Sequence, residues 1–139
     1  MRRLHFTRRG QSMVESALVL MTLIAVVSAI LDFGQVLFLN QGLVNRTRAA
    51  ARYGAVHWTD LNAVRNIVLY NSPAAPDPAP AKGFLGLTSS NVVVTRQNID
   101  SNEERIVVRI QNYPFRFFTP WLSGLYRGRE IVATAPVEI

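Results

Sequence analysis

A long apolar run near the N-terminus constrains this chain more than any other feature. Residues 14–31 contain only four polar side chains, which are Glu15, Ser16, Thr22 and Ser28. A helix needs about 20 mostly apolar residues to cross a bilayer, so this run can span one. Four arginines precede it within residues 1–10. The positive-inside rule therefore predicts a cytoplasmic N-terminus and an extracytoplasmic remainder.

The helix that begins with this run is expected to continue well beyond the membrane. No proline occurs before Pro73, so we predict one helix to Val56 or His57, a rod of roughly 70 Å. Asp32 is interpreted as the point where the helix leaves the hydrocarbon. In the second half, mostly small and apolar residues recur at helical spacing: Leu43, Thr47, Ala50, Ala51, Gly54 and Trp58. We expect this stripe to pack on another element, with Arg48 and Arg52 on a solvated flank.

The rest of the chain predicts a small α+β head. Thr59 or Asp60 can cap a short helix that ends near Tyr70, and residues 72–82 form a Pro/Ala-rich loop. Strand patterns occupy residues 91–97, 105–112 and 130–137, with Ile106, Val108 and Ile110 on one face and Ile131, Ala133 and Ala135 alternating in the last. Residues 113–125 are predicted to be a loop or a short helix. The expected sheet is antiparallel, with three to four strands packed on the long helix.

Composition excludes several function classes. The formal net charge is +6, but four of the fifteen basic residues lie in residues 1–10, and the remainder carries only +2. With no basic patch interleaved with aromatics, we do not expect nucleic-acid binding. Cysteine is absent, and neither histidine has a partner at a telling spacing. We expect Glu103 and Glu104 to be solvated. The chain therefore predicts no enzyme activity, metal, cofactor or small-molecule substrate.

The start of the apolar run resembles the processing site of a type IV prepilin. In that family a dedicated peptidase cuts after a glycine that follows a basic leader, and a glutamate is the fifth residue of the mature chain. Here Arg8 and Arg9 precede Gly10, and Glu15 is the fifth residue after it. The resemblance implies cleavage between Gly10 and Gln11, with the apolar helix retained. An uncleaved cytoplasmic stub on a single-pass anchor is the alternative.

Several segments together are similar to TadE-like pseudopilins of tight-adherence (Flp) pilus systems. These segments are residues 9–15, 32–35, 49–55, 107–115 and 119–122. The resemblance implies a pilin-like division into a leader (1–10), a long helix (11–57) that spans the membrane in its first half, and an extracytoplasmic head (58–139). It implies a minor pilin or pseudopilin of the bacterial inner membrane or pilus, acting in assembly or surface attachment. Its expected partners are a prepilin peptidase, other pilin subunits and the membrane.

Glu15 is the residue expected to matter most for assembly. An acidic side chain inside a membrane segment is costly, which makes it a functional hypothesis. The resemblance implies that its carboxylate pairs with the α-amino group freed at Gln11, in its own subunit or a neighbour. Alternatively, Glu15 extends to the headgroups and complements the helix dipole. For the whole chain, the alternative function is an uncleaved single-pass protein whose head binds a partner.

The processing site gives the first testable prediction. Co-expression with a prepilin peptidase should remove residues 1–10 and expose Gln11, and Gly10→Val should block the cut because a β-branched side chain would crowd the peptidase. Mass spectrometry of the membrane-extracted protein measures both outcomes. Recovery of protein that still begins with Met1, from cells that contain the peptidase, would contradict the prediction.

Overall fold

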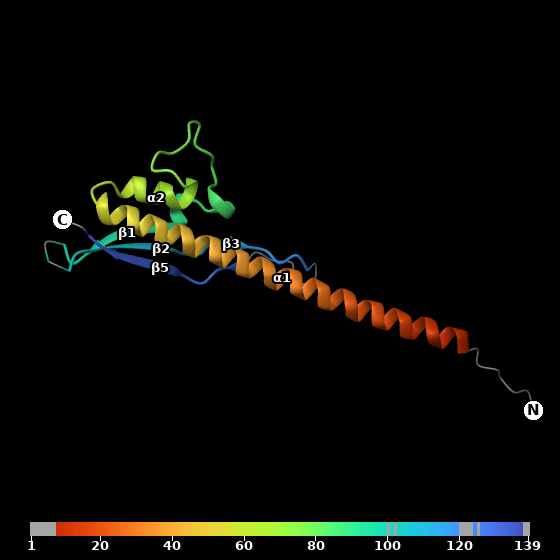
Figure 1. Cartoon of the computed structure of the whole chain (residues 1–139). Helices are drawn as coiled ribbons and strands as arrows, with labels where there is room; N and C mark the ends of the chain where they lie inside the picture. Colours follow the sequence, from red (N-terminus) through yellow and green to blue (C-terminus); the bar gives the residue numbers. More distant parts are fainter. Residues whose placement is uncertain (1–7, 100, 102, 120–123, 125, 138–139) are drawn as a thin grey trace, which may run out of the picture.

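A computed structural model describes residues 8–99, 101, 103–119, 124 and 126–137. One long helix, α1 (Arg8–Val56), runs through the molecule, and its N-terminal half projects away from the head (Figure 1). The predicted end of this helix at Val56 is confirmed. At about 1.5 Å per residue, α1 is roughly 70 Å long, about twice the thickness of the hydrocarbon core of a bilayer.

The head has two layers. A three-stranded antiparallel sheet has the order β1 (Val92–Gln97), β2 (Arg105–Ile110) and β5 (Ile131–Pro136). The second half of α1 contacts β2 and β5, and the shorter helix α2 (Leu61–Tyr70) contacts α1 and β1. Both helices therefore cover one face of the sheet (Figure 1). This architecture confirms the predicted α+β fold.

The predicted stripe on α1 forms the helical side of the core. Leu43, Thr47, Ala50, Ala51 and Gly54 are all buried, whereas Trp58 is half-buried. On the sheet side, Ile106 pairs with Ala135, Val108 with Ala133 and Ile110 with Ile131. The three β2 residues of these pairs are fully buried. The predicted core-facing residues of these strands are thus confirmed, but the alternation of β2 is incomplete, because Val107 on its other face is also buried.

Small residues on α1 let the helix approach the sheet closely. A Cβ added at Gly54 would lie 2.5 Å from Ile106 Cδ1 and 3.1 Å from Val64 Cγ2. Any side chain in place of Gly54 would have to displace Ile106 of β2 or Val64 of α2, because a protein interior has few voids to absorb it.

Local signals set the bounds of α2. The Asp60 carboxylate accepts hydrogen bonds from the backbone N–H groups of Asn62 and Ala63 (3.1 and 2.9 Å), which satisfies donors that have no partner within the helix. At the other end Asn71 is left-handed, with φ 59°, and its N–H donates to the Ile67 carbonyl. Asparagine tolerates this conformation better than most residues, so the helix ends here.

The segment between α2 and β1 is mostly irregular, as predicted for residues 72–82. Two short 3₁₀ turns follow, η1 (Phe84–Gly86) and η2 (Ser89–Asn91). Phe84 anchors the segment on α1: its Cζ atom would lie 3.1 Å from a Cβ added at Gly42, and the Arg46 guanidinium lies over its ring at 3.8 Å.

Two details of the head differ from the sequence-based predictions. Within residues 113–125, a short strand, β3 (Pro114–Phe115), pairs with β4 (Tyr126–Arg127) in a two-stranded sheet, and no helix forms among the described residues. Glu104 is buried and forms an ion pair with Arg96, so the expectation that it is solvated was wrong. The turn between β1 and β2 brings the two side chains together, a contact that neighbouring sequence does not reveal.

The close packing of α1 on the sheet can be tested with two matched substitutions. Ala51→Leu should lower the free energy of unfolding by about 1–3 kcal/mol, because the added side chain overpacks a filled interface. Ala49→Leu makes the same change on the exposed face of the same helix turn and should alter stability by no more than about 0.5 kcal/mol. Denaturant unfolding of the full chain in detergent measures both. Equal free energies of unfolding for the two variants would contradict the packing of α1 on the sheet.

Candidate functional site

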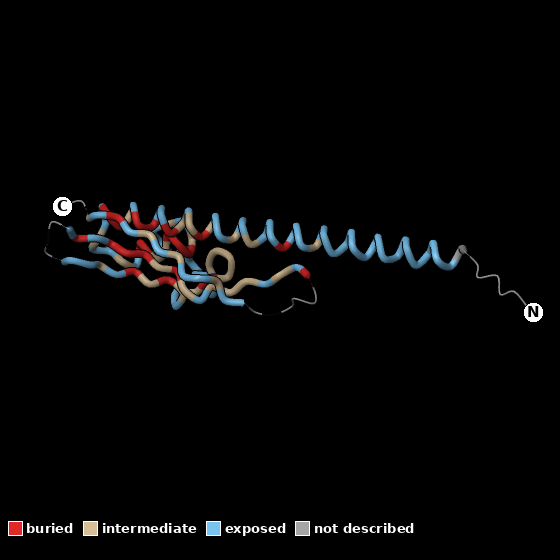
Figure 2. The backbone as a smooth tube through the Cα atoms, turned by 90° about the horizontal axis from the view of Figure 1, so that it is seen from below, coloured by how far each residue is buried: buried red, intermediate tan, exposed pale blue. Residues whose placement is uncertain are grey.

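The N-terminal half of α1 is a bare apolar helix. All but one of the described side chains from Gln11 to Leu31 are exposed, and the exception, Ser28, is only partly buried. Figure 2 shows this half as exposed and the buried residues concentrated in the head. Within the described part of the chain, α1 is the one helix that is long and apolar enough to cross a membrane, over Gly10–Val56. Residues 10–31 alone measure about 33 Å, close to the hydrocarbon thickness.

The predicted processing residues lie at the beginning of this helix. Gly10 and Gln11 are exposed in its first turns, and a Cβ added at Gly10 would have no atom within 4 Å. Residues 1–7 of the predicted leader lie outside the described residues. Glu15 is exposed one turn further on. The ion pairs among the side chains that the structure describes are Arg96–Glu104 and Arg109–Glu130. Glu15 takes part in neither pair.

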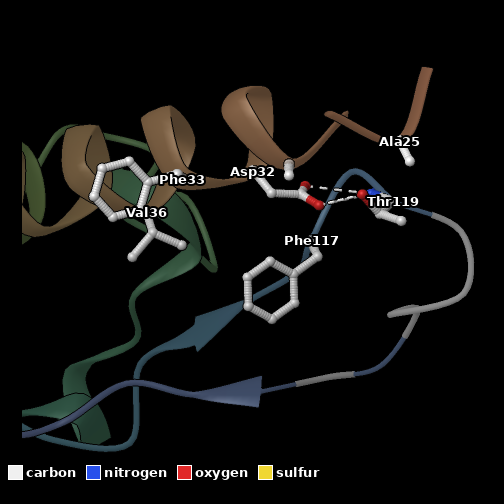
Figure 3. A pocket seen from close by; sticks show the side chains of 7 residues that line it. Ala25, Asp32, Phe33, Val36, Phe117 and Thr119 are labelled. Carbon is white, nitrogen blue, oxygen red and sulfur yellow. Dashed lines mark hydrogen bonds between the residues drawn. The ribbon is translucent and has the colours of Figure 1, made fainter. Parts of the chain in front are cut away.

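A buried carboxylate marks the point where the bare half of α1 meets the head. Asp32 is 6% exposed, and it accepts hydrogen bonds from the backbone N–H groups of Phe118 (2.5 Å) and Thr119 (3.2 Å) and from the Thr119 hydroxyl. Figure 3 shows the Asp32 carboxylate directed at Thr119, across a groove that Ala25 and Ala29 also line. A carboxylate buried at such a place is stable because several donors surround it.

A second polar residue of α1 binds the same loop. Gln35 Nε2 donates to the Arg116 carbonyl at 3.0 Å, one turn beyond Asp32. Aromatic contacts support the loop from its other side: the Phe117 ring lies edge-on to Tyr126 with centroids 4.9 Å apart, and Phe115 contacts both. We call residues 116–119 the junction loop. Two polar residues of α1 therefore fix it to the helix.

The junction was not predicted from the sequence. The interpretation of Asp32 as the exit of the helix from the hydrocarbon was incomplete, because the carboxylate bonds to residues more than 80 positions away. One signal was present: Asp32 and Gln35 are spaced by one helical turn, and both interrupt an apolar run. Such a pair indicates a polar contact on one face of the helix. The sequence did not indicate which segment supplies the partner groups.

Comparison with known proteins places the match on this same helix. The family model described as TadE-like protein matches residues 10–52. This region of the chain is TadE-like. The resemblance predicted from the sequence is confirmed over these residues. No curated protein and no solved structure has a significant match to the chain.

The TadE-like region contains the bare half of α1, Glu15 and the two helix residues that bind the junction loop. It begins at the predicted cleavage glycine and ends at Arg52, within the last turns of α1. The three-stranded sheet lies outside it. The match supports association with a tight-adherence pilus system, and the apolar helix supports a membrane-anchored protein.

Substitution of Asp32 is predicted to reduce the protection of the junction-loop amides from hydrogen exchange. Asp32→Asn should greatly increase amide hydrogen exchange at Phe118 and Thr119, because an NH₂ group replaces one acceptor oxygen and then faces the Thr119 donors. The cost of an unsatisfied buried group is about 1–3 kcal/mol, or roughly 5- to 150-fold in the opening equilibrium. NMR of the full chain in micelles measures the exchange rates.

Asp77→Asn is the matched control, since Asp77 is exposed in the Pro/Ala-rich loop. It should leave both amides as protected as in the parent. Unchanged exchange at Phe118 and Thr119 in the Asp32 variant would show that the carboxylate does not hold the junction loop.

Proposed function

We propose that this protein is a minor pilin or pseudopilin of a tight-adherence type IV pilus system. In this proposal a prepilin peptidase cuts after Gly10, and the processed subunit acts in pilus assembly or surface attachment through contacts with other pilin subunits. The role is structural, without catalysis or a cofactor. The single observation that carries the proposal is the TadE-like match over a helix with a charged residue in its bare half.

Gly10 supports processing because the packing of this chain gives no reason for a glycine there. An added Cβ would meet no atom within 4 Å, and glycine within a helix costs roughly 0.5–1 kcal/mol relative to alanine. A requirement imposed by a peptidase explains the residue. The Gly10–Gln11 bond also lies in the first turn of α1, where amides lack intrahelical partners and the helix frays most easily.

Glu15 supports assembly because it is exposed at the start of the apolar run and forms no ion pair with a side chain that the structure describes. A carboxylate in such a position needs a partner, and a buried charge is tolerated when it is paired. Cleavage would create an α-amino group at Gln11, four residues away. The same group of a neighbouring subunit can serve equally, which would join the charge pair to assembly.

The proposed location follows from the helix and its flanking charges. The arginines at the N-terminus favour a cytoplasmic leader and an inner-membrane anchor, with the head outside the cytoplasm. The bare helix then has two apolar environments open to it, the lipid bilayer before assembly and neighbouring pilin helices afterwards.

Substitution of Glu15 tests the proposal. Glu15→Ala should leave membrane insertion and cleavage intact, because the helix becomes more apolar. It should strongly reduce the share of the protein that copurifies with other pilin subunits or enters sheared filaments. Glu15→Gln should behave in the same way, since it keeps the size and loses the charge. Quantitative immunoblots of filament and membrane fractions measure this.

Ser16→Ala is the control, because Ser16 is the exposed neighbour on the same turn. It should assemble like the parent. Normal incorporation of both Glu15 variants would reject charge pairing and leave the carboxylate as a headgroup-facing residue. An uncleaved protein found only in membranes would instead favour the partner-binding, single-pass alternative.

A further inference from the structure

The end of the head that adjoins the bare half of α1 exposes aromatic side chains. Phe118 in the junction loop is 68% exposed and Phe33 of α1 is 66% exposed. Phe33 follows the buried Asp32 in the helix, and the Phe118 N–H donates to the Asp32 carboxylate. Phe118 cannot withdraw easily, since its own N–H bonds to Asp32 and its neighbour Phe117 packs on Tyr126. These two rings continue the apolar surface of the helix directly onto the head.

A cluster of basic residues lies just beyond these aromatics. We call Lys82, Arg116, Arg127 and Arg129 the basic collar. Lys82 and Arg116 line a groove with Gln35 and Leu39 of α1, and Arg127 and Arg129 line another with Val36 and Leu39. All four side chains are exposed. None forms an ion pair within the part of the chain that the structure describes, where the two pairs involve Arg96 and Arg109.

Three members of the collar share one groove. Lys82, Arg116 and Arg127 line it together with Thr88 and Ser90, whose hydroxyls lie 2.8 Å apart. Among the residues that the structure describes, no acidic side chain lines this groove. Three cations with neighbouring hydroxyl and amide groups form a surface that suits a phosphate ester, since lysine and arginine donate to its oxygens.

The spacing along α1 matches the layers of a bilayer. Residues 10–31 cover about the hydrocarbon thickness. The collar lies beside α1 at the level of Gln35 to Leu39, which is about 5–10 Å beyond Asp32 at 1.5 Å per residue. The headgroup layer is about 5–7 Å thick on each side. When the bare helix spans the membrane, the aromatics therefore lie at the acyl boundary and the collar at the phosphates.

We propose that the head rests on the outer surface of the membrane, with Phe33 and Phe118 at the acyl boundary and the basic collar bound to anionic phospholipid headgroups. The inference rests on the proposed membrane anchorage of α1 and not on the pilus role. Because Asp32 and Gln35 fix the junction loop to the helix, lipid contact with the loop sets the depth and orientation of the whole subunit. Removing the subunit from the membrane then requires release of these headgroups.

Depth measurements on single-cysteine variants test the aromatic part. The chain contains no cysteine, so a nitroxide can be placed at one position of the full chain in vesicles of phosphatidylcholine with 30% phosphatidylglycerol. A label at Val19 should be accessible to oxygen and protected from a water-soluble nickel chelate. A label at Phe118→Cys should report the headgroup boundary, and one at Ser101→Cys, in the turn between β1 and β2, should be aqueous.

The three labels separate failure of the anchor from failure of the inference. An aqueous label at Val19 would reject the proposed anchorage itself. A label at Val19 in the hydrocarbon with a fully aqueous label at Phe118 would reject the inference alone. That second result is expected if the aromatic end of the head instead contacts a partner protein.

Lipid-selective quenching tests the basic collar. A fluorophore at Ser89→Cys, an exposed position next to the shared groove that does not line it, should be quenched more by headgroup-labelled phosphatidylglycerol than by headgroup-labelled phosphatidylcholine. Arg116→Gln and Arg127→Gln should each reduce this preference, by up to roughly fivefold. Added salt should reduce it as well, because exposed charges are screened.

Arg48→Gln and Arg52→Gln are the matched controls, since both arginines are exposed on α1 but line none of these grooves. They should keep the full preference. Equal quenching by the two lipids in the parent, or an equal loss in the control and collar variants, would overturn the assignment of the collar to anionic headgroups.

Discussion

One helix has to satisfy two different surroundings, and the rest of the structure depends on how it does so. The first half of α1 exposes apolar side chains on all sides, while the second half buries a single stripe against a sheet. A continuous helix can do both because its backbone hydrogen bonds are internal along the whole length. Only the side chains change, from a uniform apolar surface to an amphipathic one. The polar group of Thr22 is also satisfied within the helix, since its hydroxyl donates to the Leu18 carbonyl at 2.9 Å.

The change between the two halves occurs at Asp32, where the junction loop meets the helix. A charged group at this boundary is stable only because backbone amides and a hydroxyl surround it. The same contact limits how the head can tilt relative to the span. Without this contact, the head could tilt or rotate relative to the N-terminal half of α1. Here two polar residues of α1 and a cluster of aromatic rings tie the domain to the exit of the helix.

The functional conclusion rests on the helix more than on the head. The TadE-like match covers residues 10–52 and stops before the sheet begins. Within that match, Gly10 has no packing role and Glu15 has no ion-pair partner among the side chains that the structure describes. In the function proposed above, processing would account for Gly10 and charge pairing between subunits for Glu15. The head adds an aromatic and basic end, which gives the subunit a means to contact the membrane surface beside its anchor.

Much of this protein was determined by local sequence. The apolar run, the absence of proline before Pro73 and the capping residue Asp60 predicted both helices with nearly correct ends. Alternating apolar residues predicted β2 and β5, and the stripe from Leu43 to Gly54 predicted the buried face of α1. These patterns are periodic, and each reports which side of one element is buried. The candidate residues Gly10, Gln11 and Glu15 were likewise visible, because a short motif carries them.

Only the tertiary structure determined what lies opposite each polar group. The partners of Asp32 are separated from it by more than 80 residues, and the pairing of Arg96 with Glu104 depends on the turn between two strands. The basic collar combines side chains from three separate segments around one level of α1. Periodicity predicts which face of a helix or strand is buried, because burial is a property of each residue by itself. It does not predict the partner of a polar side chain, because a hydrogen bond requires two residues that the fold brings together.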